Sequence, residues 1–177
     1  MISQNAVKYG VFAGVAGIVI AILMYLMGPE FLSSSMWSGM LVGLSSLVVT
    51  IVFLIVFGIK MRKEEGGYIT FGKMFLSLIV VVAVMVGIST VFSILLYQVI
   101  DPEFMATAKQ MALENFAELE DRMTEKQFED MMTRIEDGYS MSIGKSLMQI
   151  VWGILGWGIF SLILAAILKK KQEDFVG

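Results

Sequence analysis

Residues 101–123 read D-P-E-F-M-A-T-A-K-Q-M-A-L-E-N-F-A-E-L-E-D-R-M, and residues 124–139 continue as T-E-K-Q-F-E-D-M-M-T-R-I-E-D-G-Y. This segment is rich in carboxylates and cannot lie in hydrocarbon, where ionised groups are costly. An uncharged run long enough to cross a bilayer precedes it, and another follows it. The sequence therefore predicts a polar insert between two membrane spans.

The composition of the whole chain agrees with a membrane protein. Of its 177 residues, 57% are hydrophobic and 16% are charged, whereas soluble domains carry about a quarter charged residues. There is no cysteine and no histidine, which excludes disulfides, zinc sites built on these residues, and catalysis by Cys or His. We expect no cofactor, no metal and no nucleic-acid partner.

Four uncharged runs have the length of membrane-spanning helices. They cover residues 9–28, 36–59, 74–100 and 145–168, with Lys145 at the boundary of the last. About 20 residues suffice at a rise of 1.5 Å per residue, so the third run must tilt or project beyond the membrane. The sequence predicts an all-α, polytopic membrane protein with residues 1–177 in one domain and an insert at residues 101–144.

The insert carries the signals of two helices. Asp101 and Pro102 are typical of an N-cap and a first helical residue, so we expect a helix over 102–121. Thr124 and Gln127 have capping-box spacing, which predicts a second helix over 125–137 that ends at Gly138. Apolar residues on the two helices form a candidate interaction face, consisting of Phe104, Met111, Phe116, Leu119, Phe128, Met131, Met132 and Ile135.

This face allows three arrangements. The two helices can pair as an antiparallel hairpin, lie on the outer leaflet, or hold a helix of a partner. The sequence also places an acidic stripe on the first helix, at Glu114, Glu118 and Asp121. Such a stripe can collect a divalent cation or a basic partner, but a solvated face with ion pairs is the favoured interpretation because no EF-hand loop is present. The methionines of the insert likewise favour packing over copper binding.

Lys and Arg are distributed unequally between the two sides of the spans. Eight fall in short segments that would share one side; five fall in or beside the insert, where eleven carboxylates outnumber them. Because short cytoplasmic segments carry an excess of Lys and Arg, we expect both termini in the cytoplasm and the insert outside. The topology anchors are the two basic clusters, Lys60, Arg62, Lys63, Lys169, Lys170 and Lys171.

Small residues recur in three of the spans at alternating steps of three and four. This period keeps each stripe on one face and predicts close helix packing in a left-handed bundle. We favour packing within one chain over a seam between two copies, since four spans find partners in the same chain first. The helix-packing candidates are Gly10, Gly14, Gly17, Gly39, Gly43, Ser46, Gly153 and Gly156.

Four short motifs relate the chain to a known family. They are G-Y-I-T-F-G-K-M-F at residues 67–75, I-D-P-E at 100–103, T-E-K-Q-F-E-D-M-M at 124–132 and A-A-I-L-K-K-K at 165–171. In order and spacing, from about Lys8 to Lys171, they resemble a family of bacterial four-helix inner-membrane proteins classed only as a domain of unknown function. The resemblance implies an inner-membrane location and four spans, and it carries over no catalytic or binding residue.

The functional expectation rests mainly on what the spans lack. Apart from Lys145 at the boundary, no Asp, Glu, Lys, Arg or His lies in them, which counts against ion-coupled transport and proton relays. We expect a non-enzymatic integral membrane protein whose insert acts in protein–protein or membrane-surface interaction, with lipid, a second copy or another membrane protein as partners. The alternative is a small transporter or channel subunit that forms a pore on oligomerisation, which a continuous polar cavity would favour. An unnoticed enzymatic activity is a third, weaker alternative.

Overall fold

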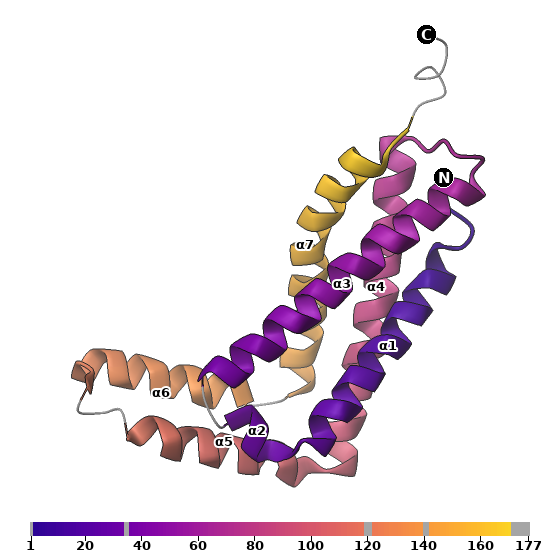
Figure 1. Ribbon diagram of the computed structural model, residues 1–177. Helices are drawn as coiled ribbons and strands as arrows, with labels where there is room; N and C mark the ends of the chain where they lie inside the picture. Colours follow the sequence, from indigo (N-terminus) through magenta and orange to yellow (C-terminus); the bar gives the residue numbers. More distant parts are fainter. Residues whose placement is uncertain (1, 34–35, 119–121, 140–141, 171–177) are drawn as a thin grey trace.

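The computed structural model describes residues 2–33, 36–118, 122–139 and 142–170, and within them every regular element is a helix (Figure 1). The all-α fold class is therefore confirmed. The elements are α1 (Ala6–Leu26), α2 (Gly28–Ser33), α3 (Met36–Glu64), α4 (Phe71–Ile94), the π-helix η1 (Leu95–Ile100), α5 (Pro102–Ala117), α6 (Glu125–Tyr139) and α7 (Ile143–Leu168).

Four helical segments are long and apolar enough to cross a membrane, as predicted. They are Ala6–Leu26, Gly43–Glu64, Phe71–Ile100 and Gly144–Leu168. The third starts three residues before the predicted boundary at Met74. Thr70 explains this early start, because its hydroxyl accepts the backbone N–H of Lys73 at 3.4 Å and caps α4.

Local structure adds a short helix after the first span and differs from the prediction at the end of the second insert helix. The connector after the first span forms the short helix α2, which follows directly on α1 because Gly28 adopts a φ of +84°. The second insert helix does not end at Gly138 but continues to Tyr139. Gly66 and Gly67, in the turn after α3, have φ values of 78° and 90°, a left-handed backbone that glycine adopts readily.

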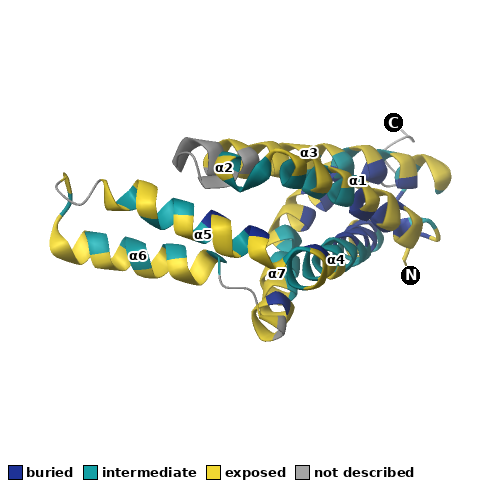
Figure 2. Cartoon of the chain, turned by 90° about the horizontal axis from the view of Figure 1, so that it is seen from below, coloured by how far each residue is buried: buried dark blue, intermediate teal, exposed yellow. Residues whose placement is uncertain are grey.

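The spans form an unequal bundle in which α4 lies between α1 and α7 and packs along both of them, while α3 crosses this layer (Figure 1). The first and last described residues lie at one end of the bundle, here called the terminus end. Helices α5 and α6 lie at the opposite end, the insert end, and extend sideways from the bundle (Figures 1 and 2). The handedness of the bundle stays a prediction.

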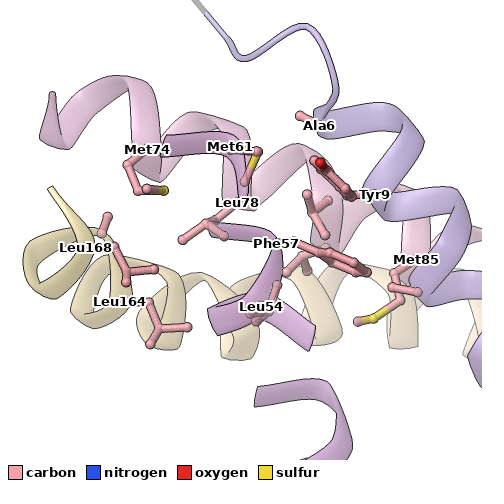
Figure 3. Close-up of a cluster of buried hydrophobic side chains, with 14 of the residues drawn as sticks. Ala6, Tyr9, Leu54, Phe57, Met61, Met74, Leu78, Met85, Leu164 and Leu168 are labelled. Atoms are coloured by element: carbon pink, nitrogen blue, oxygen red, sulfur yellow. The ribbon is translucent and has the colours of Figure 1, made fainter. Parts of the chain in front are cut away.

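An apolar core closes the terminus half of the bundle (Figure 3). Tyr9 of α1 stacks on Phe57 of α3, with ring centroids 4.8 Å apart. Leu54, Met61 and Met74 are fully buried between α3 and α4. Further members of this core are Ala6, Ala13, Ile69, Leu78, Val81, Val82, Met85, Leu164, Ala165 and Leu168.

Hydrogen bonds hold the helices together at the same end. Glu64 of α3 accepts hydrogen bonds from the Tyr9 hydroxyl at 2.5 Å and from the Asn5 amide at 2.9 Å. Arg62 donates to the carbonyl oxygen of Leu168 at 3.3 Å, on the last turn of α7. The backbones of Ile69 and Lys170 exchange two hydrogen bonds of 3.0 Å. These contacts join α1, α3, α7 and the loop before α4 at the terminus end.

The insert half of α3 has much less contact with the other spans. Every residue from 43 to 49 is exposed, and this stretch covers about two helical turns. No face of the helix is therefore covered there. Among the α3 residues whose burial is described, the buried ones all lie nearer the terminus end; they are Leu54, Phe57, Gly58 and Met61. Helix α3 is thus packed at one end and separated from the α1–α4–α7 layer at the other.

Candidate functional site

Helices α5 and α6, here called the arm, are attached to the bundle through the first turns of α5. One carboxylate oxygen of Asp101 accepts the backbone N–H of Phe104 at 3.0 Å, and the other accepts the Tyr25 hydroxyl at 2.9 Å. The ring of Phe104 lies 5.0 Å from that of Tyr25 and 5.5 Å from that of Tyr97. Phe104 and Ala108 are the buried residues of α5, so the arm is anchored at its root.

Beyond the root, α5 and α6 contact each other. The rings of Phe116 and Phe128 stack with centroids 5.7 Å apart, and Lys109 forms an ion pair with Glu136 at 3.7 Å. Pairs 116–128 and 109–136 require the two helices to run antiparallel. The described members of the candidate interaction face therefore differ in their surroundings. Phe104 is buried at the root, Met111, Phe116, Phe128, Met131, Met132 and Ile135 are half-buried along the arm, and Leu119 lies outside the described residues.

The charged surface of the arm is open. In α6 no residue is buried, and Figure 2 shows mostly exposed positions along its length. On α5, Glu114 accepts a hydrogen bond from Gln110 at 2.9 Å, and Glu118 is exposed. Asp121, the third member of the acidic stripe, lies outside the described residues. Among the residues described, no cluster of three or more His, Cys, Asp or Glu side chains is arranged to hold a metal ion.

A reciprocal cap begins α6. The Thr124 hydroxyl accepts the backbone N–H of Gln127 at 3.4 Å, and the Gln127 side chain accepts the N–H of Thr124 at 3.2 Å. We expect Thr124→Ala to destabilise α6 by about 1 kcal/mol, measured as faster hydrogen exchange of the α6 amides. Thr133→Ala is the matched control, because the Thr133 hydroxyl bonds within the helix to the Glu129 carbonyl. Equal effects of the two changes would contradict this role of the cap.

The small residues have different surroundings in the three spans. On α1, a Cβ atom added at Gly10, Gly14 or Gly17 would lie 2.7 to 2.9 Å from Val84, Ile88 or Ser89 of α4. On α7, one at Gly153 would lie 3.4 Å from Val86, whereas one at Gly156 would meet nothing within 4 Å. On α3, Gly43 also has open space around it, Ser46 is exposed, and the surroundings of Gly39 are not described.

The topology anchors occupy one end of the molecule. Lys60, Arg62 and Lys63 lie in the last turns of α3, and Lys169 and Lys170 directly follow α7, both at the terminus end. Lys171 lies outside the described residues. The described part of the basic clusters therefore stands opposite the arm.

A cavity of about 510 Å³ opens in the insert half of the bundle, between α3 and the α1–α4–α7 layer. All four spans line it. Among the described residues, its wall carries no ionisable side chain and seven with a hydroxyl or amide group, which are Ser46, Thr50, Ser89, Thr90, Ser93, Ser146 and Gln149. The rest of the wall is apolar, with Phe53, Phe92 and Trp157 among its larger members. The apolar core of the terminus half separates this space from the other end.

The convergence of these polar side chains is not apparent from the sequence. Most of them are recognisable there as polar residues within spans, and their ordinary interpretation is hydrogen bonding between helices. In the structure, Thr50 instead donates to the Ser46 carbonyl of its own helix at 2.9 Å. Within the described chain, no hydrogen bond uses the side chains of Ser89, Thr90 or Ser93. The feature of the sequence that could have indicated this cavity is the number of serine and threonine residues in the insert halves of the spans.

Comparison with known protein families matches residues 8–170 to the family described as Protein of unknown function (DUF4199). The matched range includes all four spans and the arm. No curated protein matches the chain, and no solved structure matches it. The resemblance to a family of unknown function is confirmed, and the bacterial origin stays a prediction.

Proposed function

Because the chain belongs to the family of proteins of unknown function named DUF4199, its membership supplies no activity, and we propose its function from the arm. The protein is a multi-pass membrane protein of the bacterial inner membrane with both termini in the cytoplasm. Its arm lies outside and binds a partner protein through a basic surface on that partner. Its role is non-enzymatic.

The observation that carries this proposal is the position of α6. It has no buried residue and extends away from the bundle, so the core of the spans does not need it. A capping box and contacts with α5 nevertheless stabilise α6. An acidic helix held in this way is suited to a basic protein surface, which it attracts over about 8 Å at physiological salt. Anionic lipid headgroups would be repelled.

The expected topology gives a direct test. The natural chain has no cysteine, so single cysteines can be placed at Asp130 in the arm and at Lys63 at the terminus end, where both residues are exposed. In intact cells, we expect a membrane-impermeant maleimide to label the cysteine at 130 and to label the cysteine at 63 only after permeabilisation. Labelling of 63 from outside would contradict the orientation.

The interaction itself is tested by crosslinking in cells. Photoreactive residues at Glu129 or Arg134 should give discrete protein adducts, whereas one at the exposed span residue Ile163 should give lipid adducts. The paired change Glu129→Lys and Asp130→Lys should abolish the protein adducts. Glu30→Lys, which reverses one exposed carboxylate in α2 outside the arm, is the control. If only lipid is captured from the arm, or if the control is equally disruptive, the proposal is wrong.

The transport alternative requires a continuous polar path. The polar cavity occupies only the insert half, and buried residues such as Leu54, Met61 and Leu78 fill the terminus half. The arrangement therefore favours interaction at the arm over conduction.

A further inference from the structure

We propose that the cavity between α3 and the α1–α4–α7 layer is a binding site for an uncharged, oxygen-bearing lipid that enters sideways from the bilayer. The chosen class is a neutral glyceride such as diacylglycerol. This site is independent of the role proposed for the arm, since it lies among the spans and needs no protein partner.

Size and composition of the wall define the ligand class. A volume of about 510 Å³ lies within the range of small-molecule sites, which are mostly apolar with a few polar groups. The seven polar side chains are neutral, and no Asp, Glu, Lys or Arg in the described part of the chain lines the cavity. A charged headgroup would lose its hydration there without a counter-ion. Neutral ester and hydroxyl oxygens can instead pair with serine and threonine hydroxyls.

Unpaired polar groups distinguish this space from an ordinary lipid-facing groove. Ser146 is only 6% exposed and lines the cavity, yet no hydrogen bond within the described residues uses its hydroxyl. Ser89 and Ser93 on the facing helix α4 also line the cavity, and no hydrogen bond within the described residues uses their hydroxyls. A hydrocarbon chain alone would leave these groups without partners, which is unfavourable in an apolar medium. By contrast, the shallow groove around Gly87 on α1 and α4 has a largely apolar lining.

The route of access follows from the exposure of α3. Residues 43–49 are exposed on all sides of that helix, so the cavity is open beside it rather than enclosed. Within a bilayer, both sides of α3 face hydrocarbon at this depth. A lipid can therefore reach the hydroxyls by moving sideways. The rim toward the arm is formed by Ser146 and Gln149, next to the ion pair between Lys145 and Asp137 at 3.1 Å.

The test uses the full chain in vesicles of phosphatidylethanolamine and phosphatidylglycerol. A diacylglycerol with a photoreactive group in one acyl chain should label peptides around Met24, Met85 and Trp157, and unlabelled diacylglycerol should compete. Gly43→Leu places a side chain in the cavity from a position where an added Cβ meets nothing within 4 Å. We expect it to reduce labelling at least about tenfold.

Gly156→Leu is the matched control, because Gly156 is an exposed span glycine with the same open surroundings outside the cavity wall. It should label as the natural protein does. A second variant keeps the shape of the cavity and removes hydroxyls, through Ser89→Ala, Thr90→Val and Ser93→Ala. It should weaken competition by diacylglycerol about tenfold. Equal elution volumes in size-exclusion chromatography and equal unfolding temperatures in detergent would show that all variants are folded.

Three results would overturn the proposal. The first is labelling that Gly43→Leu leaves unchanged. The second is equal labelling by photoreactive phosphatidylglycerol, with equal competition, which would mean adventitious bilayer lipid only. The third concerns Ser46, which is exposed on α3. If Ser46→Cys forms a covalent dimer in membranes and this dimer excludes the probe, a second copy of the chain fills the cavity instead.

Discussion

Replacing Gly10 by leucine is expected to separate α1 from α4 and to leave little folded protein. A Cβ atom at this position would lie 2.7 Å from the Cβ of Val84 and 3.0 Å from the backbone oxygen of Val81. The carbonyl oxygen belongs to the helix itself and cannot turn aside, so the two helices must move apart along their whole contact. Overpacking of this kind costs about 3 kcal/mol, a large part of the stability of a small protein.

The measurement is thermal unfolding in detergent, together with the yield of monodisperse protein. Gly156→Leu is again the control, because it adds the same side chain to a span where nothing lies within 4 Å. We expect the control to unfold at nearly the natural temperature. If both variants lose stability equally, the cost comes from changing a glycine within a span, and the close approach of α1 to α4 is not what the small residues provide.

Replacing Asp101 by alanine is expected to destabilise the root of the arm by about 2 kcal/mol, from the loss of an N-cap and of a second hydrogen bond. Its two carboxylate oxygens bond Phe104 of α5 and Tyr25 of α1, so both contacts disappear at once. Hydrogen exchange should accelerate in the first turns of α5, and thermal unfolding in detergent should shift downward.

Two comparisons separate this effect from a simple loss of charge. Asp101→Asn should remain close to the natural protein, because asparagine is an equally good N-cap and its amide can still pair with the Tyr25 hydroxyl. Asp137→Ala removes another aspartate of the insert, whose ion pair with Lys145 is exposed, and should cost under about 1 kcal/mol. An Asp101→Asn protein as unstable as Asp101→Ala would show that charge, rather than hydrogen bonding, holds the root.

Hydropathy and caps made most of the fold predictable. The four spans follow from uncharged runs, and the start of α5 follows from Asp101 and Pro102, because these signals are local. The start of α4 was missed because Lys73 interrupts the uncharged run, although Thr70 caps the helix ahead of it. The end of α6 was missed because Gly138 is tolerated in the last turn of a helix, and the helix simply continues through it to Tyr139.

The candidate sites divide in the same way. The arm was predictable because its apolar and acidic residues lie close together in sequence. The cavity was not, because Thr50, Ser89 and Ser146 come from three helices whose separation depends on the angle of α3. Nothing in the residues of α3 fixes that angle locally. It results from where the helix is fastened, through Arg62 and Glu64 at the terminus end.

Because α3 is attached mainly at the terminus end, a small rotation there displaces its other end. The pivot point lies near Gly58, where an added Cβ would lie 2.5 Å from the Leu168 side chain, and the insert half of the helix extends about 22 Å from there to Gly43. A rotation of about 5° about this pivot point moves the helix at Gly43 by about 2 Å. Within a bilayer, the acyl chains beside α3 and the contacts of α2 with α3 would oppose this rotation. Lateral pressure in the bilayer would therefore act on the width of the gap.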